Sequence, residues 1–119
     1  MIVLTKIFIG IVALEHLYFL VLEMFLWTKP KGLKTFGLKS KEFAEDTKVL
    51  AANQGLYNGF LAAGLIYGWI LDLKSIILFI LACVVIAGIY GAYSTKKSRL
   101  FFVQGVPALI ALILVYFYY

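Results

Sequence analysis

Two glutamates and a histidine, Glu15, His16 and Glu23, lie within the first hydrophobic stretch of the chain. At the centre of a membrane span such a residue costs roughly 2.5–3.5 kcal/mol on insertion scales, so each requires a reason. On a helix, His16 and Glu23 lie nearly in line, ~10 Å apart, and Glu15 is turned ~80° from Glu23. All three therefore point into one sector. A neighbouring carboxyl and imidazole suit proton uptake or relay, because histidine titrates near neutral pH.

Uncharged polar side chains continue this pattern in two later hydrophobic stretches. They are Asn53, Gln54, Tyr57, Asn58 and Gln104. Gln54 and Asn58 are four residues apart and share a helix face, with Tyr57 beside them. Counted from the ends of their segments, Glu23, Gln54 and Gln104 lie ~6–8 Å inside the membrane. Glu15, His16 and Asn58 lie nearer the midplane, so the sequence predicts a polar pocket that opens to the cytosol and ends near His16.

Three uses of this pocket are weighed. Interhelical hydrogen bonds would explain single amides, but neutral amides would hold helices together at lower cost than Glu15, His16 and Glu23 do. Imidazole and carboxylate groups also ligate metals, yet two of these residues are adjacent, the third is two turns away and there is no second histidine. We therefore expect no metal and no cofactor, and favour a binding or catalytic pocket.

The composition indicates which elements hold these residues. The hydrophobic fraction is 64% and only 14% of residues are charged, against ~25% in an average soluble domain. Four hydrophobic segments, at about 2–27, 49–71, 75–93 and 100–119, each approach the ~20 residues that cross a bilayer as a helix. The sequence predicts an all-α integral membrane four-helix bundle, with residues 1–119 as one transmembrane domain. The first segment lacks a cleavage site and is expected to be retained.

The lysines orient this bundle. Nine of the eleven lysine and arginine residues lie in residues 28–48 and 94–99, so the positive charge is concentrated in two loops. The positive-inside rule places both loops in the cytoplasm and both termini outside the cell membrane. Membrane lipid is the expected partner and nucleic acid is not. Ser40 is a helix-start residue, so we expect one long helix over residues 41–71.

Small residues and one proline indicate how the helices pack. Gly55, Gly59 and Ala63 form a seam that we place opposite the amide face, and Ala87, Gly88 and Gly91 form another. Such seams mediate helix contacts, within the bundle or in a homo-oligomer. Pro107, with Gly105, is expected to kink the last helix or start it late.

Several motifs carry a resemblance to a known family. They are Ala13-Leu14-Glu15-His16-Leu17-Tyr18, Leu22-Glu23-Met24-Phe25-Leu26-Trp27, Lys34-Thr35-Phe36-Gly37-Leu38, Ala52-Asn53-Gln54-Gly55-Leu56-Tyr57-Asn58-Gly59, Ala87-Gly88-Ile89-Tyr90-Gly91 and Phe102-Val103-Gln104-Gly105-Val106-Pro107-Ala108. Together they resemble the family of small bacterial membrane proteins known as domain of unknown function 1304. The resemblance implies a four-helix membrane protein and leaves its activity open.

Three functions are compatible with the predicted pocket. The first is binding or transport of a small polar or amphipathic molecule, coupled to protons through Glu15, His16 and Glu23. The second is a membrane enzyme acting on a lipophilic substrate, with Glu23 or His16 as acid or base. The chain is loosely similar to the four-helix eicosanoid and glutathione metabolism proteins, although it lacks their arginine-rich glutathione motif. The third is a structural or interaction subunit.

Overall fold

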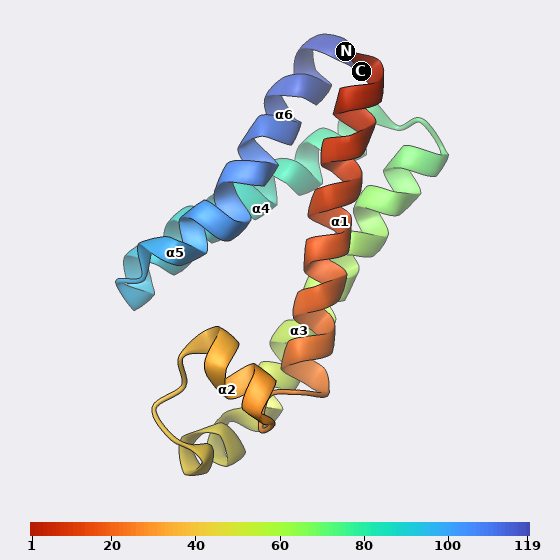
Figure 1. Cartoon of the computed structure of the whole chain (residues 1–119). Helices are drawn as coiled ribbons and strands as arrows, with labels where there is room; N and C mark the ends of the chain where they lie inside the picture. Colours follow the sequence, from red (N-terminus) through yellow and green to blue (C-terminus); the bar gives the residue numbers. More distant parts are fainter. The chain divides into compact units, whose positions relative to one another are not determined.

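A computed structural model describes all residues, 1–119, and the chain is all-α with no strand, as the sequence predicts (Figure 1). In chain order the elements are α1 (Ile2–Met24), α2 (Pro30–Phe36), α3 (Lys41–Ile70), α4 (Lys74–Thr95), α5 (Ser98–Leu100), the π-helix η1 (Phe101–Gly105) and α6 (Val106–Tyr118). They fall into two compact units. The first comprises Met1–Glu15 and Leu61–Tyr119, and the second comprises His16–Phe60. The helices α1 and α3 each contribute to both.

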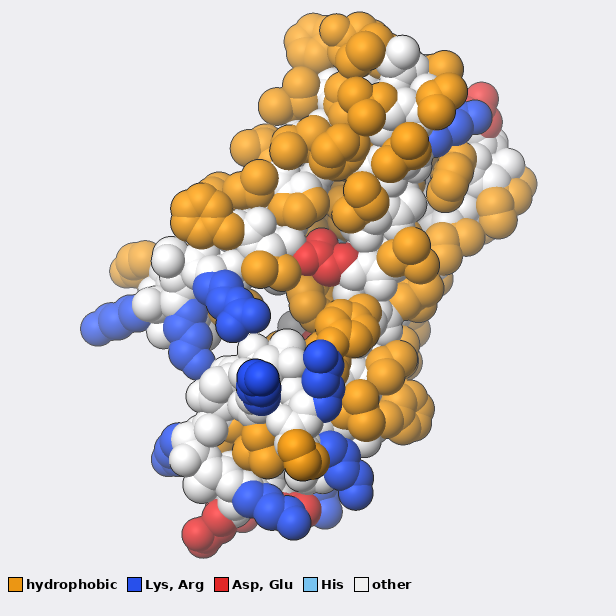
Figure 2. Space-filling model, in the orientation of Figure 1, with side chains coloured by type: hydrophobic (Ala, Val, Ile, Leu, Met, Phe, Trp, Pro, Cys, Tyr) orange, Lys and Arg blue, Asp and Glu red, His pale blue; other side chains and the backbone are white.

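Three helical segments have the length and apolar composition to cross a membrane: α1, α4 and Ser98–Tyr118. Their outer faces carry large apolar side chains, for example Phe79 on α4 and Phe117 on α6, each 67% exposed. Hydrophobic side chains likewise dominate the visible surface of α6 (Figure 2). Lipid is the solvent that suits such faces, which indicates a membrane protein. The fourth predicted span, 49–71 on α3, is not among these segments, because polar residues interrupt its apolar character.

The hydrophobic core of the first unit draws on all four of its long helices. Its buried members are Ile9, Val12, Ala13, Leu65, Ile77, Leu81, Val84, Ala108, Ala111 and Val115. On α6 the small residues Ala108 and Ala111 are three apart and completely buried, so they share a face that packs closely. Without a hydrophobic driving force between helices in lipid, this close packing is what holds the helices together.

The last helix is irregular where the sequence predicts it to be. A π-helical turn, η1, immediately precedes α6, and the Val106 N–H donates to the Phe101 carbonyl. Pro107 follows directly and has no N–H of its own to donate to the preceding turn. The continuous helical segment that ends with α6 nevertheless begins at Ser98, so its start is not late.

Two glycines let η1 approach α4. A Cβ placed on Gly88 would lie 2.9 Å from the Gly105 Cα and 3.0 Å from its nitrogen. Both neighbours are backbone atoms, which cannot rotate away as a side chain would. Gly91, on the next turn of α4, is less confined, because a Cβ there would lie 3.8 Å from the nearest atom, Leu100 Cδ1.

The connection between α1 and α3 contains a short helix, α2, that was not predicted. Residues 28–48 are expected from the sequence to connect two membrane spans as a loop. In α2, Pro30 occupies the first turn, where a missing N–H costs nothing. Gly37 ends the helix in the left-handed conformation (φ 58°) that glycine adopts readily.

The expected start of α3 is confirmed, because the Phe43 N–H donates to Ser40 Oγ at 3.0 Å. The helix then runs to Ile70, one residue short of the predicted end.

We expect Gly88→Ala to destabilise the protein by roughly 1–3 kcal/mol, because the new methyl group would force two backbones apart. The matched control is Gly91→Ala, which has room for the methyl group and should be neutral or stabilising by up to about 1 kcal/mol. Reversible unfolding in mixed detergent micelles measures both. Equal stability of the two variants would show that the Gly88–Gly105 contact does not constrain the helices.

Candidate functional site

The candidate site lies in the second unit, where α1 and α3 pack through glycines. A Cβ on Gly55 would lie 2.8 Å from Met24 Cγ and 3.2 Å from the Leu20 carbonyl oxygen. A Cβ on Gly59 would lie 2.5 Å from Leu20 Cδ1. The two helices therefore approach more closely than larger residues would allow.

This contact corrects one prediction. The glycine seam is expected opposite the amide face, but Gly55 and Gly59 face the same helix as Asn58 does. Asn58 follows Gly55 by three residues, which is close to one turn, so the two share a side of α3. Ala63 is exposed and does not continue the seam.

A buried hydrogen bond crosses the interface beside these glycines. Asn58 Nδ2 donates to Glu23 Oε1 at 2.6 Å, and both residues are only 7% exposed. The two residues are 35 positions apart in sequence, so the bond joins α1 to α3 directly. A short bond to a carboxyl oxygen is among the stronger kinds of hydrogen bond. It positions the Glu23 carboxyl group at a fixed point between the helices.

His16 lies two turns before Glu23 on α1 and is completely buried. Its imidazole meets the Phe19 ring edge-to-face, with 5.6 Å between the ring centroids. A buried imidazole and a buried carboxyl group thus occur on one helix, as the sequence predicts. That the pocket opens to the cytosol and ends near His16 remains a prediction.

Glu15 and Gln104 belong to the other unit. The Glu15 Oε2 atom is buried and has no hydrogen-bond partner. Gln104 lies half-buried in η1. The predicted layer that combines Glu23, Gln54 and Gln104 therefore remains a prediction.

An open cavity of about 420 Å³ has Glu23 among its lining residues. Its lining residues are Glu23, Met24, Phe25, Trp27, Thr28, Lys48, Val49, Ala52, Asn53 and Leu56. Two of them, Glu23 and Asn53, are among the predicted site residues. Asn58 is not a lining residue, and Gln54 and Tyr57 are exposed and do not line the cavity. Asn53 is also exposed, and its Nδ2 donates to the Val49 carbonyl of its own helix at 3.0 Å.

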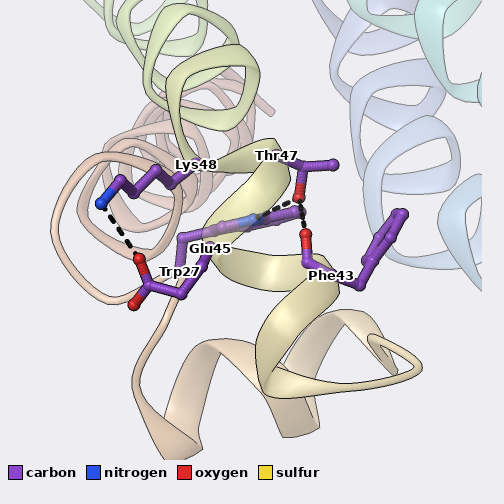
Figure 3. A network of polar contacts seen from close by, with 5 residues as sticks. All are labelled: Trp27, Phe43, Glu45, Thr47 and Lys48. Atoms are coloured by element: carbon purple, nitrogen blue, oxygen red, sulfur yellow. Dashed lines mark hydrogen bonds and ion pairs between the residues drawn. The ribbon is translucent and has the colours of Figure 1, made fainter.

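A polar network fixes the end of α1 next to this cavity (Figure 3). Trp27 Nε1 donates to Thr47 Oγ1 at 3.1 Å, and the Thr47 hydroxyl donates to the Phe43 carbonyl at 2.7 Å. Lys48 forms an ion pair with Glu45 at 3.0 Å one turn away. The hydrogen bond between Trp27 and Thr47 was not predicted. The position of Trp27 at the end of the first hydrophobic segment, 2–27, was the available indication.

The lining residues define what the cavity can hold. Most of its wall is aliphatic or aromatic, with Glu23 as its only acidic residue and Lys48 as its only basic one. A molecule that fits would need an apolar body and a polar group able to reach a carboxyl or amide. No group of three or more His, Cys, Asp or Glu residues is arranged to hold a metal ion.

Comparison with known proteins gives the chain its relatives. Residues 10–116 match the family described as "Protein of unknown function (DUF1304)". The chain is also 31% identical, over 120 residues, to the uncharacterized protein YpaA of Lactococcus lactis subsp. lactis (strain IL1403). That alignment covers 98% of this chain and 100% of the relative. No solved structure matches the chain. The match over most of its length means that the chain belongs to the DUF1304 family of proteins of unknown function.

Proposed function

We propose that this protein spans the cell membrane four times, with α3 as the span added to the three apolar segments. The helix α3 has 30 residues, which is ~45 Å of helix. That length crosses a hydrocarbon core of ~30 Å and leaves several turns outside it. Its polar residues need not face lipid where they pack on α1. With the lysines of residues 28–48 and 94–99 in the cytoplasm, both termini lie outside.

The pocket between α1 and α3 is proposed to bind and move a small polar or amphipathic molecule. The observation that carries this proposal is a buried glutamate, Glu23, among the lining residues of an otherwise largely apolar open cavity. Joining two helices does not require an acid, because an amide pair would hydrogen-bond at lower cost. A glutamate that Asn58 holds in place and that also lines this cavity is better suited to meet a ligand. Gln54 and Tyr57, which are exposed on α3, are proposed as residues on its path.

Proton coupling is the proposed role of the ionisable groups on α1. His16 and Glu23 are both buried on that helix, and a buried carboxyl oxygen of Glu15 lacks a hydrogen-bond partner. Groups of this kind inside membrane proteins commonly form proton relays. A Glu23 carboxyl group that exchanges its proton for a bound ligand would link the two movements. A path across the whole membrane would require a homo-oligomer, because four helices enclose too little space.

We predict that a small molecule co-purifies with the protein from its native membrane. Wild type and the control Glu42→Gln, which removes an exposed acid outside the cavity, should retain it. Glu23→Gln, which removes the carboxyl group, and Ala52→Trp, which fills the cavity, should lose it. Mass spectrometry of the bound fraction measures this. Identical bound fractions in all four proteins would rule out the pocket as a ligand site and favour a purely structural role.

A further prediction concerns proton movement in proteoliposomes that enclose a pH-sensitive dye. With the co-purified molecule added, an imposed pH gradient should drive proton flux through wild type and Glu42→Gln. His16→Ala and Glu23→Gln should each slow this flux by about 100-fold, as loss of a positioned proton-transfer group does. Unchanged flux in both variants would contradict proton coupling, while leaving ligand binding to be judged by co-purification.

A further inference from the structure

Five lysines in residues 28–41 have no acidic residue among them. They are Lys29, Lys31, Lys34, Lys39 and Lys41, and all are exposed. We call these five lysines, with the helix α2 that carries two of them, the basic platform. Figure 2 shows lysine side chains gathered over α2 and the start of α3. The acidic residues of this region come later, on α3, and Glu45 is paired with Lys48.

The basic platform is held firmly against the end of α1. A Cβ on Gly32 would overlap the Leu26 carbonyl oxygen, so α2 lies directly against the α1 terminus. The rings of Trp27 and Phe36 pack with their centroids 5.0 Å apart. Gly37 then closes α2 by donating its N–H to the carbonyls of the last turn. These contacts present the lysines as a fixed surface rather than a flexible tail.

The position of the basic platform, just after the apolar helix α1, indicates which molecules it can bind. The helix α1 is long and apolar enough to cross a membrane, and α2 begins six residues after its end. At that level the abundant anions in a bilayer are the phosphates of lipid headgroups. Residues 28–41 contain no aspartate or glutamate that could neutralise Lys29, Lys31 or Lys34. An anionic lipid is the partner that complements both their charge and their position.

We infer that the basic platform binds the phosphate headgroups of anionic phospholipids, as a site separate from the cavity at Glu23. Each lysine near an anionic bilayer surface is worth about fivefold in affinity. Attraction among exposed charges also weakens as salt rises. The platform should therefore select anionic over zwitterionic lipid, most strongly at low salt. This inference requires membrane insertion of α1 but not the proposed ligand transport.

The fluorescence of Trp27 allows the preference for anionic lipid to be measured next to α2. The protein contains two tryptophans, so Trp69→Phe leaves Trp27 as the reporter. In bilayers of brominated phosphatidylglycerol or brominated phosphatidylcholine, quenching of Trp27 gives the relative affinity for the two headgroups. Phosphatidylglycerol should be preferred, and Lys31→Gln with Lys34→Gln should reduce that preference about 25-fold at low salt, about fivefold for each lysine. Raising the salt to 0.5 M should reduce it in the parent protein.

The matched control removes two lysines elsewhere, through Lys6→Gln with Lys74→Gln, and should keep the preference of the parent. Circular dichroism confirms that each variant is folded, and quenching by phosphatidylcholine reports a general change around Trp27. An equal preference in the parent and the Lys31/Lys34 variant would overturn the inference. Loss of the preference on adding millimolar inorganic phosphate would also overturn it, because the site would then be one for a soluble anion.

Discussion

The close contact between α1 and α3 is the constraint on which the rest of the second unit depends. Gly55 and Gly59 bring the two backbones near enough to bury the Glu23 carboxyl group against Asn58. Larger residues would separate the helices, lengthen the 2.6 Å hydrogen bond and let solvent or lipid reach the acid. The seam and the polar pair are therefore one feature. The glycines supply the approach and the hydrogen bond compensates for a carboxyl group in an apolar setting.

The polar groups of the second unit become more buried from α2 back along α1. The exposed lysines of α2 are followed by the Trp27–Thr47 hydrogen bond, the Glu23–Asn58 hydrogen bond and the completely buried His16. Trp27 from the first of these hydrogen bonds and Glu23 from the second line the cavity of about 420 Å³. If α1 and α3 span the membrane, an amphipathic molecule would meet charge, then a hydrogen-bonding aromatic residue, then a carboxyl group. Lipid headgroups at the platform and a ligand at Glu23 would occupy successive levels of one path.

Much of the fold follows from local sequence rules. The Ser40 cap, the single long helix after it and the irregularity before Pro107 depend on residues within a few positions of one another, and they were predicted. The unusual polarity of α1 was also predictable, because a glutamate in an apolar stretch needs no structure to be noticed. The helix α2 was missed, although Pro30 at its start and Gly37 at its end are recognised helix boundaries. Only seven residues long, it lacks the apolar periodicity that identifies longer helices.

The partners of the site residues were harder to predict, because helix periodicity gives a face but not the neighbour that covers it. Gln54 and Asn58 share a face by spacing, yet Asn58 is buried against Glu23 and Gln54 is exposed. The prediction that Gly55 packs on the side opposite the amides was wrong for the same reason. Residues such as Thr28 and Lys48 line the cavity because the segment that follows α1 lies close to the side of α3, which no local pattern shows.

The central claim is that Glu23 and Asn58 form a buried bond that joins α1 to α3 and fixes the acid beside the cavity. A double-mutant cycle of Glu23→Met, Asn58→Leu and the double variant, measured by reversible unfolding in mixed detergent micelles, tests it directly. Each single substitution should destabilise the protein by leaving a buried polar partner unpaired. The double variant should lose less than the sum, with a coupling energy of about 1–2 kcal/mol, at the upper end for interhelical bonds in membranes. Additive losses, with no coupling energy, would contradict the claim.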